Sequence, residues 1–518
     1  MLRLFLILLL CPSLCLADEI DVLLKQGTIY DGNSITPLVG DVAIRDGKIL
    51  AVGSLDASNA KVIVNCSGKI ICPGFIDLHN HSDKQVVSHL TRANINYLLQ
   101  GCTTVVTGNC GSGPVDVAKY YGKINAAGCG TNVVHLLPQG DLRRQVMGSE
   151  RRKPTGAELT KMQSLADKAM RDGAWGMSTG LIYVPSSYAE TTEIITIAKV
   201  VADHGGIYAS HIRGEGSGLL DSIREAIQIG LKAELPVHVS HFKSSGKTNW
   251  GQVRAAANLI ERARLKGQQV TADQYPYRAS STSLHASLIP AWARAGGRKA
   301  MLERFDDKED GKRIRDAIQL KLKAAEGGKI IRIARCYKQE WVGKNLAAIS
   351  ESAEKPALQI VEIIERNGGA QVVKFNMSPE DIRYVMTLEW VATASDGRAY
   401  LPGADKPHPR SYGTFPRKIS LFAQQEKVLS VGAAIRSATG LPAKILGIKD
   451  RGTIAPGFVA DLAVLDPRTL ADKATFDDPH RYCEGISYVL LGGEFSVYRG
   501  KATGALHGRA IEKPPKND

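Results

Sequence analysis

The sequence predicts an α/β fold: a (β/α)8 barrel of the TIM type, with a small β-sandwich domain built from both termini. Eight apolar segments of strand length alternate with segments of helical periodicity, and short strands with tight turns occupy both ends of the chain. The interval after the seventh strand is too long for one helix, which predicts an inserted subdomain there. The eight expected strands are residues 70–81, 103–110, 132–137, 176–183, 207–213, 237–243, 270–277 and 390–396.

Residues 1–17 have the pattern of a secretory signal peptide. Arg3 precedes a short apolar run, and Cys15 and Ala17 place small residues at positions −3 and −1 of a cleavage site before Asp18. The run is too short to cross a bilayer, and no other segment has the required length of apolar residues. We therefore expect a secreted or periplasmic protein without a membrane span.

The mature chain divides into a barrel and a domain assembled from both termini. Residues 18–70 and 436–510 are expected to form the small β domain, because Asp-Gly turns such as Asp31-Gly32 lie between short apolar runs. Residues 71–435 would form the barrel, with an insertion at about 288–346 that could be a lid or only a packing element. Residues 511–518 form a polar tail.

Composition restricts the class of protein and its partners. With 44% hydrophobic and 23% charged residues, the chain is neither disordered nor fibrous. Its net charge of +14 is spread out, and the densest basic segments, 143–144 and 151–153, lack interleaved aromatic residues. A solvated surface is therefore favoured over nucleic-acid binding, and the basicity suits a small anionic substrate; the oligomeric state stays open.

The cysteines are not a disulfide framework. Seven of the nine remain after residue 17, an odd number without any Cys-x-x-Cys pair, so at least one thiol is free or bound to another group.

Metal-binding residue types recur where the expected strands end. In a (β/α)8 barrel these ends meet at one rim, where imidazole, thiolate and carboxylate groups can bind Zn²⁺. One buried His or Cys is most often structural, but six such residues at the ends of five strands are hard to explain by packing. They are His79, His81, Cys110, His211, His241 and Asp396.

Longer motifs around these residues identify a family. The Gly-Asn-Cys-Gly motif at 108–111 and the His-Pro-Arg motif at 408–410 are more specific than the His-x-His motif at 79–81. With them, the sequence resembles the amidohydrolase superfamily and, within it, the N-acyl-D-amino-acid deacylases, or D-aminoacylases. The matching motifs are residues 73–81, 101–111, 178–185, 210–215, 240–243, 273–277, 395–397 and 408–417.

This resemblance implies a zinc hydrolase that releases a carboxylate and a free D-amino acid. Cys110, His211 and His241 would hold the main Zn²⁺, and His79 and His81, together with the late aspartate, would form a second, weaker position. Other branches of the superfamily bridge two metals with a carboxylated lysine on strand four, which this chain lacks. The cysteine would take its place; whether one or two metals are bound stays open.

The resemblance also implies catalytic roles. Zinc would supply hydroxide by lowering the pKa of water to about 7, and Asp396 would act as general base and then as general acid. Tyr183 or Tyr277 would help to stabilise the oxyanion; Tyr275 and Tyr277 share strand parity, and the sequence does not decide which one faces the substrate.

Substrate binding is implied in the same way. Arg410 matches the position where the deacylases bind the α-carboxylate, to which a guanidinium can bond in a bidentate manner. Lys243 shares strand parity with His241, so we expect it to point into the same cavity.

Two alternatives remain. A cyclic-amide hydrolase of the dihydropyrimidinase or hydantoinase type shares the His-x-His motif and the late aspartate, but normally needs the strand-four lysine. A catalytically silent barrel relative would have lost the metal, yet all the expected ligands are present. The loop 137–140 departs from the family's Gly-His-Gly pattern, so the side-chain, acyl and D/L preferences stay open.

Overall fold

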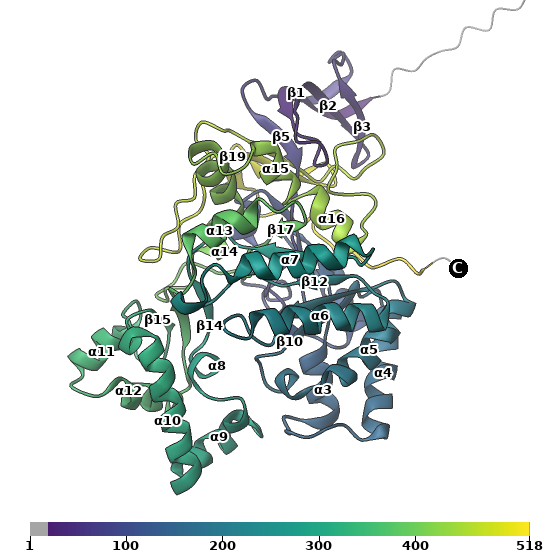
Figure 1. The fold of residues 1–518 in the computed structure, drawn as a ribbon. Helices are drawn as coiled ribbons and strands as arrows, with labels where there is room; N and C mark the ends of the chain where they lie inside the picture. The colour runs from purple at the N-terminus through teal and green to yellow at the C-terminus, as the bar shows by residue number, and fades with distance from the viewer. Residues whose placement is uncertain (1–18, 517–518) are drawn as a thin grey trace, which may run out of the picture.

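The computed structural model describes residues 19–516, and its centre is a parallel barrel (Figure 1). β8 and β9 are two parts of one expected strand: β8 pairs with β7 and β9 pairs with β10, so eight strand positions surround the core. The barrel prediction is confirmed. Its strands are β6 (Phe75–Asp77), β7 (Cys102–Thr107), β8 (Asn132–His135), β9 (Leu137–Pro138), β10 (Gly176–Gly180), β11 (Ile207–His211), β12 (Val237–Val239), β13 (Val270–Gln274) and β17 (Val391–Thr393).

The barrel closes between its last and first strands through the residues that follow them. Asn80 and Gly397 form a parallel bridge, and the amide of Asp396 donates to the carbonyl of His79. The buried Asp77 carboxylate accepts hydrogen bonds from the amide and the hydroxyl of Ser395, at 2.8 and 2.5 Å. The first and last strands are therefore held in register next to Asp396.

The expected first strand, residues 70–81, is in fact two strands in two different sheets. β5 (Ile70–Pro73) pairs with β1 (Ile20–Ile29) and with β18 (Leu462–Leu465), whereas β6 pairs with β7 in the barrel. Gly74 lies between them, and a side chain there would collide with Thr103. The chain thus passes from the small domain into the barrel at a glycine.

The small domain is a nine-stranded sheet made from both ends of the chain, as predicted. Its strand order is β21-β20-β19-β18-β5-β1-β2-β3, with β4 paired to β1. Buried aliphatic side chains from both ends, among them Leu24 and Leu462, form one core. The remaining strands are β2 (Leu38–Arg45), β3 (Lys48–Gly53), β4 (Ala60–Asn65), β19 (Ile486–Leu491), β20 (Glu494–Tyr498) and β21 (Lys501–Ala502).

The C-terminal range expected for this domain, 436–510, is too broad. Helix α16 (Gly440–Leu446) contacts β6 and β17, so it belongs to the barrel. The extreme C-terminal segment also returns to the barrel, where the amide of Ile511 donates to the carbonyl of Val133 and the Trp175 indole donates to the carbonyl of Ile511.

The inserted subdomain lies beside the barrel (Figure 1). It has an antiparallel sheet, β14-β16-β15, and a hydrophobic core that runs from Leu284 to Val372, so it extends beyond the expected 288–346 on both sides. Its elements are β14 (Ser280–Ser283), α8 (Leu284–Leu288), α9 (Gly297–Asp306), α10 (Lys308–Ala324), β15 (Ile331–Arg335), α11 (Leu346–Ser352), α12 (Ala357–Arg366) and β16 (Gln371–Lys374).

Helices cover the outside of the barrel. In α6 (Leu219–Ala233), buried residues recur at helical spacing (Leu219, Ile223, Ala226, Ile229), which is the amphipathic pattern of a helix packed on one side. The remaining α-helices are α1 (Ile95–Leu98), α2 (Val117–Ala127), α3 (Gln139–Met147), α4 (Gly156–Arg171), α5 (Thr191–Asp203), α7 (Gln252–Leu265), α13 (Pro379–Met386), α14 (Arg410–Arg417) and α15 (Val431–Arg436).

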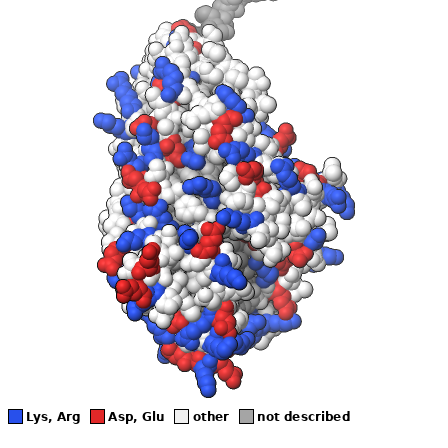
Figure 2. All heavy atoms as spheres, turned by 60° about the vertical axis from the view of Figure 1, so that its left-hand side comes forward, with Lys and Arg blue, Asp and Glu red and all other residues white. Residues whose placement is uncertain are grey.

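Within residues 19–516, no helix combines the length and apolar character needed to span a membrane. On the face shown in Figure 2, Lys and Arg are mixed with Asp and Glu rather than gathered in one basic patch.

Gly108, in the turn after β7, should be the glycine near the barrel rim that least tolerates a side chain. Gly108 has a φ of 78°, and a Cβ there would collide with the carbonyl of Leu136. We predict that Gly108→Ala lowers the free energy of unfolding by about 2 kcal/mol or more, because left-handed strain and a backbone clash add together. Urea unfolding followed by circular dichroism measures this.

Gly447→Ala is the matched control. Gly447 has the same left-handed backbone, with a φ of 83° and a ψ of 22°, and nothing lies within 4 Å of its Cβ position, so only the conformational cost of about 1 kcal/mol should appear. Equal losses for the two variants would contradict the close approach at Gly108.

Candidate metal centre

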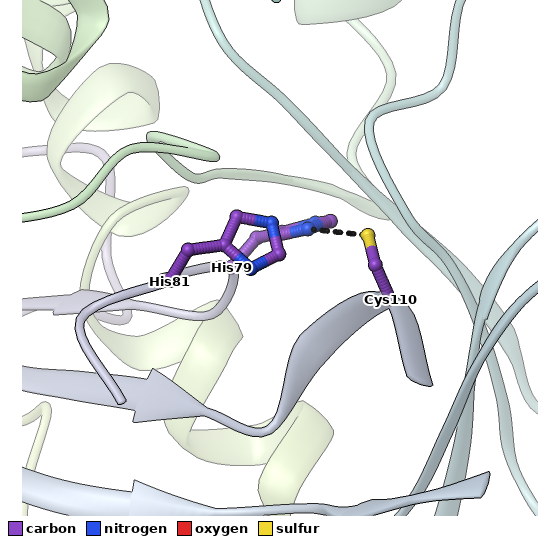
Figure 3. A group of neighbouring side chains, drawn as sticks. All are labelled: His79, His81 and Cys110. Carbon is purple, nitrogen blue, oxygen red and sulfur yellow. Dashed lines mark hydrogen bonds between the residues drawn. The ribbon is translucent and has the colours of Figure 1, made fainter. Parts of the chain in front are cut away.

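The thiol of Cys110 lies among imidazole nitrogens at the C-terminal rim of the barrel. Its Sγ is 3.3 Å from His79 Nε2, 3.5 Å from His211 Nδ1 and 3.9 Å from His241 Nε2. Figure 3 shows His79 and His81 directed toward this sulfur from the segment that follows β6. Imidazoles from three other strand ends thus surround one sulfur, at the rim where the sequence predicted that these residues converge.

The donor atoms form overlapping groups of three, within which they lie no more than 4.8 Å apart. His211 Nδ1 and His241 Nε2 are only 2.7 Å apart, a separation at which two nitrogen lone pairs need a proton or a cation between them. Sulfur and imidazole donors in a buried site fit Zn²⁺. The groups among the described residues are Cys110/His211/His241, His79/His81/Cys110 and His79/His241/Asp396, so the cysteine belongs to two of them.

Three of these residues have a strained backbone. Cys110, His241 and Asp396 have φ values of 53°, 38° and 50°, in the left-handed region that side chains other than glycine seldom adopt. Each follows the end of its strand, and the reversed conformation turns the side chain inward over the rim. Strain of this kind persists where surrounding contacts over-determine it, and it concentrates at functional sites.

The electrostatic surroundings favour the ionised forms of the candidate metal-binding side chains. Burial raises the pKa of the Cys110 thiol, but the neighbouring His79 and His211 outweigh burial and hold that pKa well below its ordinary value. Burial likewise raises the pKa of Asp396, and Arg410 and His79 hold it well below the ordinary carboxyl range. Both shifts favour the charged form: the thiolate of Cys110, which is the form that binds metals, and the carboxylate of Asp396.

Asp396 lies between two histidines and an arginine. Its Oδ1 is 3.0 Å from His81 Nε2 and 3.5 Å from His79 Nε2, while its Oδ2 is 2.6 Å from Arg410 Nη1. The guanidinium of Arg410 also stacks on the ring of Tyr275, 4.6 Å from its centroid. The carboxylate is thus fixed at the edge of the donor cluster.

Asp273, which sequence reasoning did not assign, holds two of the histidines in place. Its Oδ2 lies 3.3 Å from His79 Nδ1 and 2.9 Å from His238 Nε2, and its Oδ1 accepts the backbone amide of His241 at 2.8 Å. A carboxylate on the far ring nitrogen fixes the orientation of a metal-binding histidine. Its position at the end of β13, in register with the other strand ends, was the available signal.

Glu215 has the same role for His241 and was also missed. Its Oε1 lies 2.9 Å from His241 Nδ1 and forms an ion pair with Lys243. The Lys243 Nζ is itself 2.8 Å from His241 Nδ1. As expected from strand parity, Lys243 lies on the same side as His241, at the face of its ring that meets Glu215; neither residue lines the cavity described below, and the substrate-binding role of Lys243 stays a prediction.

A cavity of about 530 Å³ opens onto the cluster, between the barrel rim and the inserted subdomain. His81, Cys110, Asp396, Arg410 and Tyr183 all line it, and the Tyr183 hydroxyl lies 3.1 Å from Thr282 Oγ1.

Tyr277 does not line this cavity, contrary to expectation. Its hydroxyl donates to Asp472 at 2.9 Å, and its ring packs against His408. Tyr275 is the nearer of the two tyrosines, because Arg410 stacks on it.

A family model described as "Amidohydrolase family" matches residues 62–497 of the chain. Among curated proteins, the D-aminoacylase of Alcaligenes xylosoxydans xylosoxydans is 32% identical over 96% of this chain and 98% of its own length.

Two solved structures match nearly the whole fold, each with a TM-score of 0.82. One is from a study of the binuclear metal centre of D-aminoacylase, at 31% identity, covering 95% of this chain and 100% of its own. The other is N-acyl-D-glutamate deacylase from Bordetella bronchiseptica, complexed with zinc and a phosphonate inhibitor, at 30% identity, covering 96% and 100%.

Removing the central thiolate should remove the metal. We predict that Cys110→Ala, dialysed against buffer with trace zinc, retains less than about one tenth of the wild-type metal content, because two donor groups lose their shared ligand. Elemental analysis of the purified protein measures this. Cys336→Ala is the control, since Cys336 lies in the inserted subdomain outside the cluster; wild-type metal content in Cys110→Ala would contradict the assignment.

Proposed function

Because the chain belongs to the amidohydrolase family, and within it to the D-aminoacylases, we propose that it hydrolyses the amide bond of N-acyl-D-amino acids. The products are a carboxylate and a free D-amino acid, and the cofactor is Zn²⁺. The observation that supports this most directly is the Cys110 thiolate shared by two donor groups, with Asp396 and Arg410 at the edge of the same cavity.

Cys110, His211 and His241 would hold the tightly bound zinc, and His79, His81 and the carboxylate of Asp396 would provide a second, weaker position. A zinc ion at this rim supplies Lewis acidity, which lowers the pKa of water to about 7 and polarises an amide carbonyl. The chain's own residues orient the substrate and move the proton.

Asp396 is the proton carrier of the proposed reaction. Its carboxylate is ionised, so it can accept the proton of the attacking water and then deliver it to the leaving nitrogen. When Arg410 binds the α-carboxylate of the substrate, part of its attraction for Asp396 is diverted. The pKa of Asp396 then rises toward a value from which the proton can be returned.

Tyr183 is the proposed donor to the oxyanion. Burial, and then the negative charge of Cys110, raises the pKa of its hydroxyl, so the hydroxyl keeps its proton and can donate a hydrogen bond. Tyr183 lines the cavity beside His211, with 5.0 Å between the ring centroids.

The cyclic-amide alternative is less well supported. β10 is Gly-Met-Ser-Thr-Gly and has no lysine to bridge two metals, whereas a cysteine occupies the centre of the cluster. A catalytically silent relative is disfavoured because each expected donor is present and buried or half-buried at the rim.

We also propose that the protein acts outside the cytoplasm, secreted or periplasmic. Residues 1–17 lie outside the described part of the structure, so this proposal rests on their sequence. N-terminal sequencing of the exported protein should begin at Asp18; a mature protein that begins at Met1 would contradict it.

The substrate class can be tested with zinc-loaded protein. We expect hydrolysis of N-acetyl-D-amino acids, at least tenfold faster than of their L-enantiomers, and no hydrolysis of dihydrouracil. Release of the free amino acid measures turnover, and chelator-treated protein is the control. Activity on dihydrouracil alone would refute the proposal; cleavage of the L-series alone would refute its stereochemistry.

Asp396→Asn keeps the shape of the side chain and removes its basicity. We predict that kcat falls by about 100-fold or more, within the usual contribution of a general base, while most of the zinc is retained. Asp405→Asn is the matched control, because Asp405 lines the cavity but is paired with His480. Full activity of the Asp396→Asn variant would remove this residue from the mechanism.

A further inference from the structure

The wall of the cavity that the inserted subdomain contributes is rich in arginine. Arg294 follows Trp292 in a short turn, Arg298 lies in α9, and Arg335 ends β15. All three line the cavity that opens onto the metal centre. We call these three residues the arginine wall.

None of the three is in an ion pair with a carboxylate among residues 19–516. Of the other three arginines that line the cavity, two are paired: Arg144 with Asp141, and Arg410 with Asp396.

Arg294 provides the strongest evidence that the arginine wall binds an anion. Its side chain is largely buried, and the residue is only 8% exposed. Its Nη2 donates to the carbonyl of Ile182 at 3.0 Å, and its Nε is buried without any hydrogen-bond partner. A buried guanidinium without a counter-ion is costly, so its position at a cavity indicates that an anion completes it.

One acidic residue, Glu365, lines the same part of the cavity, so its charge has to be included in the net charge of the wall. Glu365 is fully buried, and neither of its carboxylate oxygens makes a hydrogen bond; His285 Nδ1 lies 3.7 Å from one of them. Arg298 donates to the Glu365 backbone carbonyl rather than to its carboxylate. Even with Glu365 ionised, three guanidiniums leave a net charge of about +2 on this wall.

We propose that the arginine wall binds a second negative charge of the substrate, remote from the amide that is cleaved. This inference rests on the proposed deacylase function. Because Arg410 is already assigned to the α-carboxylate, the second anion has to come from another part of the molecule. Guanidinium groups recognise carboxylates through paired, charge-assisted hydrogen bonds. A carboxylate is also the anion that the side chain or the acyl group of an N-acyl amino acid carries, so we assign the group as a carboxylate.

Two parts of the substrate can carry that carboxylate. It belongs either to the amino-acid side chain, as in an N-acyl-D-glutamate, or to the end of a dicarboxylic acyl group, as in an N-succinyl-D-amino acid. The cavity of about 530 Å³ is of a size that holds drug-sized ligands, so it accommodates either extension.

Pairs of acids and their uncharged amides separate the two sources. kcat/KM is measured for N-acetyl-D-glutamate against N-acetyl-D-glutamine, and for N-succinyl-D-leucine against N-succinamoyl-D-leucine. In each pair the shape is kept and one charge is removed. We expect the acid to be preferred at least tenfold in one pair, the usual effect of a hydrogen bond to a charged group, and that pair identifies the source.

Variants of the wall test its role. Arg335→Met removes an exposed member that the fold tolerates, and Arg294→Met removes the buried one; each should reduce the acid-to-amide ratio severalfold. Lys312→Met is the control, because it removes one positive charge from the exposed surface of α10 in the same subdomain. Its ratio should equal that of the wild type, and circular dichroism confirms that each variant folds.

The outcomes distinguish this inference from the proposed function. Equal rates for acid and amide in both pairs, or a preference for the amides, would overturn the arginine wall and leave the deacylase activity established. If no compound is hydrolysed, the deacylase proposal fails. The anion-binding role of the arginine wall is then tested by calorimetry, which compares the affinities for N-acetyl-D-glutamate and N-acetyl-D-glutamine; equal affinities would refute it.

Discussion

The structure depends on one constraint: a cysteine thiolate has to be held within about 4 Å of three imidazoles that come from three other strands. The barrel makes this possible because its parallel strands all end at one rim. The last step is local, since Cys110, His241 and Asp396 have left-handed backbones that turn their side chains inward. Contacts within the site hold these backbones in place: the amide of His241 donates to Asp273, and the amide of Asp396 donates to the carbonyl of His79.

Charge compensation links the cluster to its surroundings. Asp273 and Glu215 orient His79 and His241 from behind, so the ring nitrogens that face the Cys110 sulfur are available to bind a cation. Asp396 is shared between histidines and Arg410, which also lines the substrate cavity. In the proposed mechanism, substrate binding and the basicity of the carboxylate would be coupled through this one guanidinium. The inserted subdomain closes the cavity on the opposite side and brings further positive charge.

The sequence predicted those features that follow from periodicity and residue type. The barrel follows from apolar strands that alternate with helices, and the two-ended small domain follows from short strands and tight turns at both ends of the chain. The convergence of Cys110, His211 and His241 follows from metal-binding residue types at the strand ends. Strand parity could not separate Tyr275 from Tyr277. β13 ends at Gln274, so the alternation of a strand no longer governs either residue.

Other features depend on contacts between distant segments, which a single sequence does not contain. The break at Gly74 is visible only when Thr103 is seen against it. The roles of Asp273 and Glu215 depend on which histidine each carboxylate meets. The three arginines of the inserted subdomain lie up to 41 positions apart in sequence, between Arg294 and Arg335, and only the fold shows that they line one cavity.

The central claim is that a thiolate binds the catalytic zinc. X-ray absorption spectroscopy of the zinc-loaded protein tests this most directly, because sulfur and nitrogen scatter at different distances. We predict one sulfur at about 2.3 Å together with nitrogen ligands at about 2.0–2.1 Å. A coordination shell made only of nitrogen and oxygen would contradict the account.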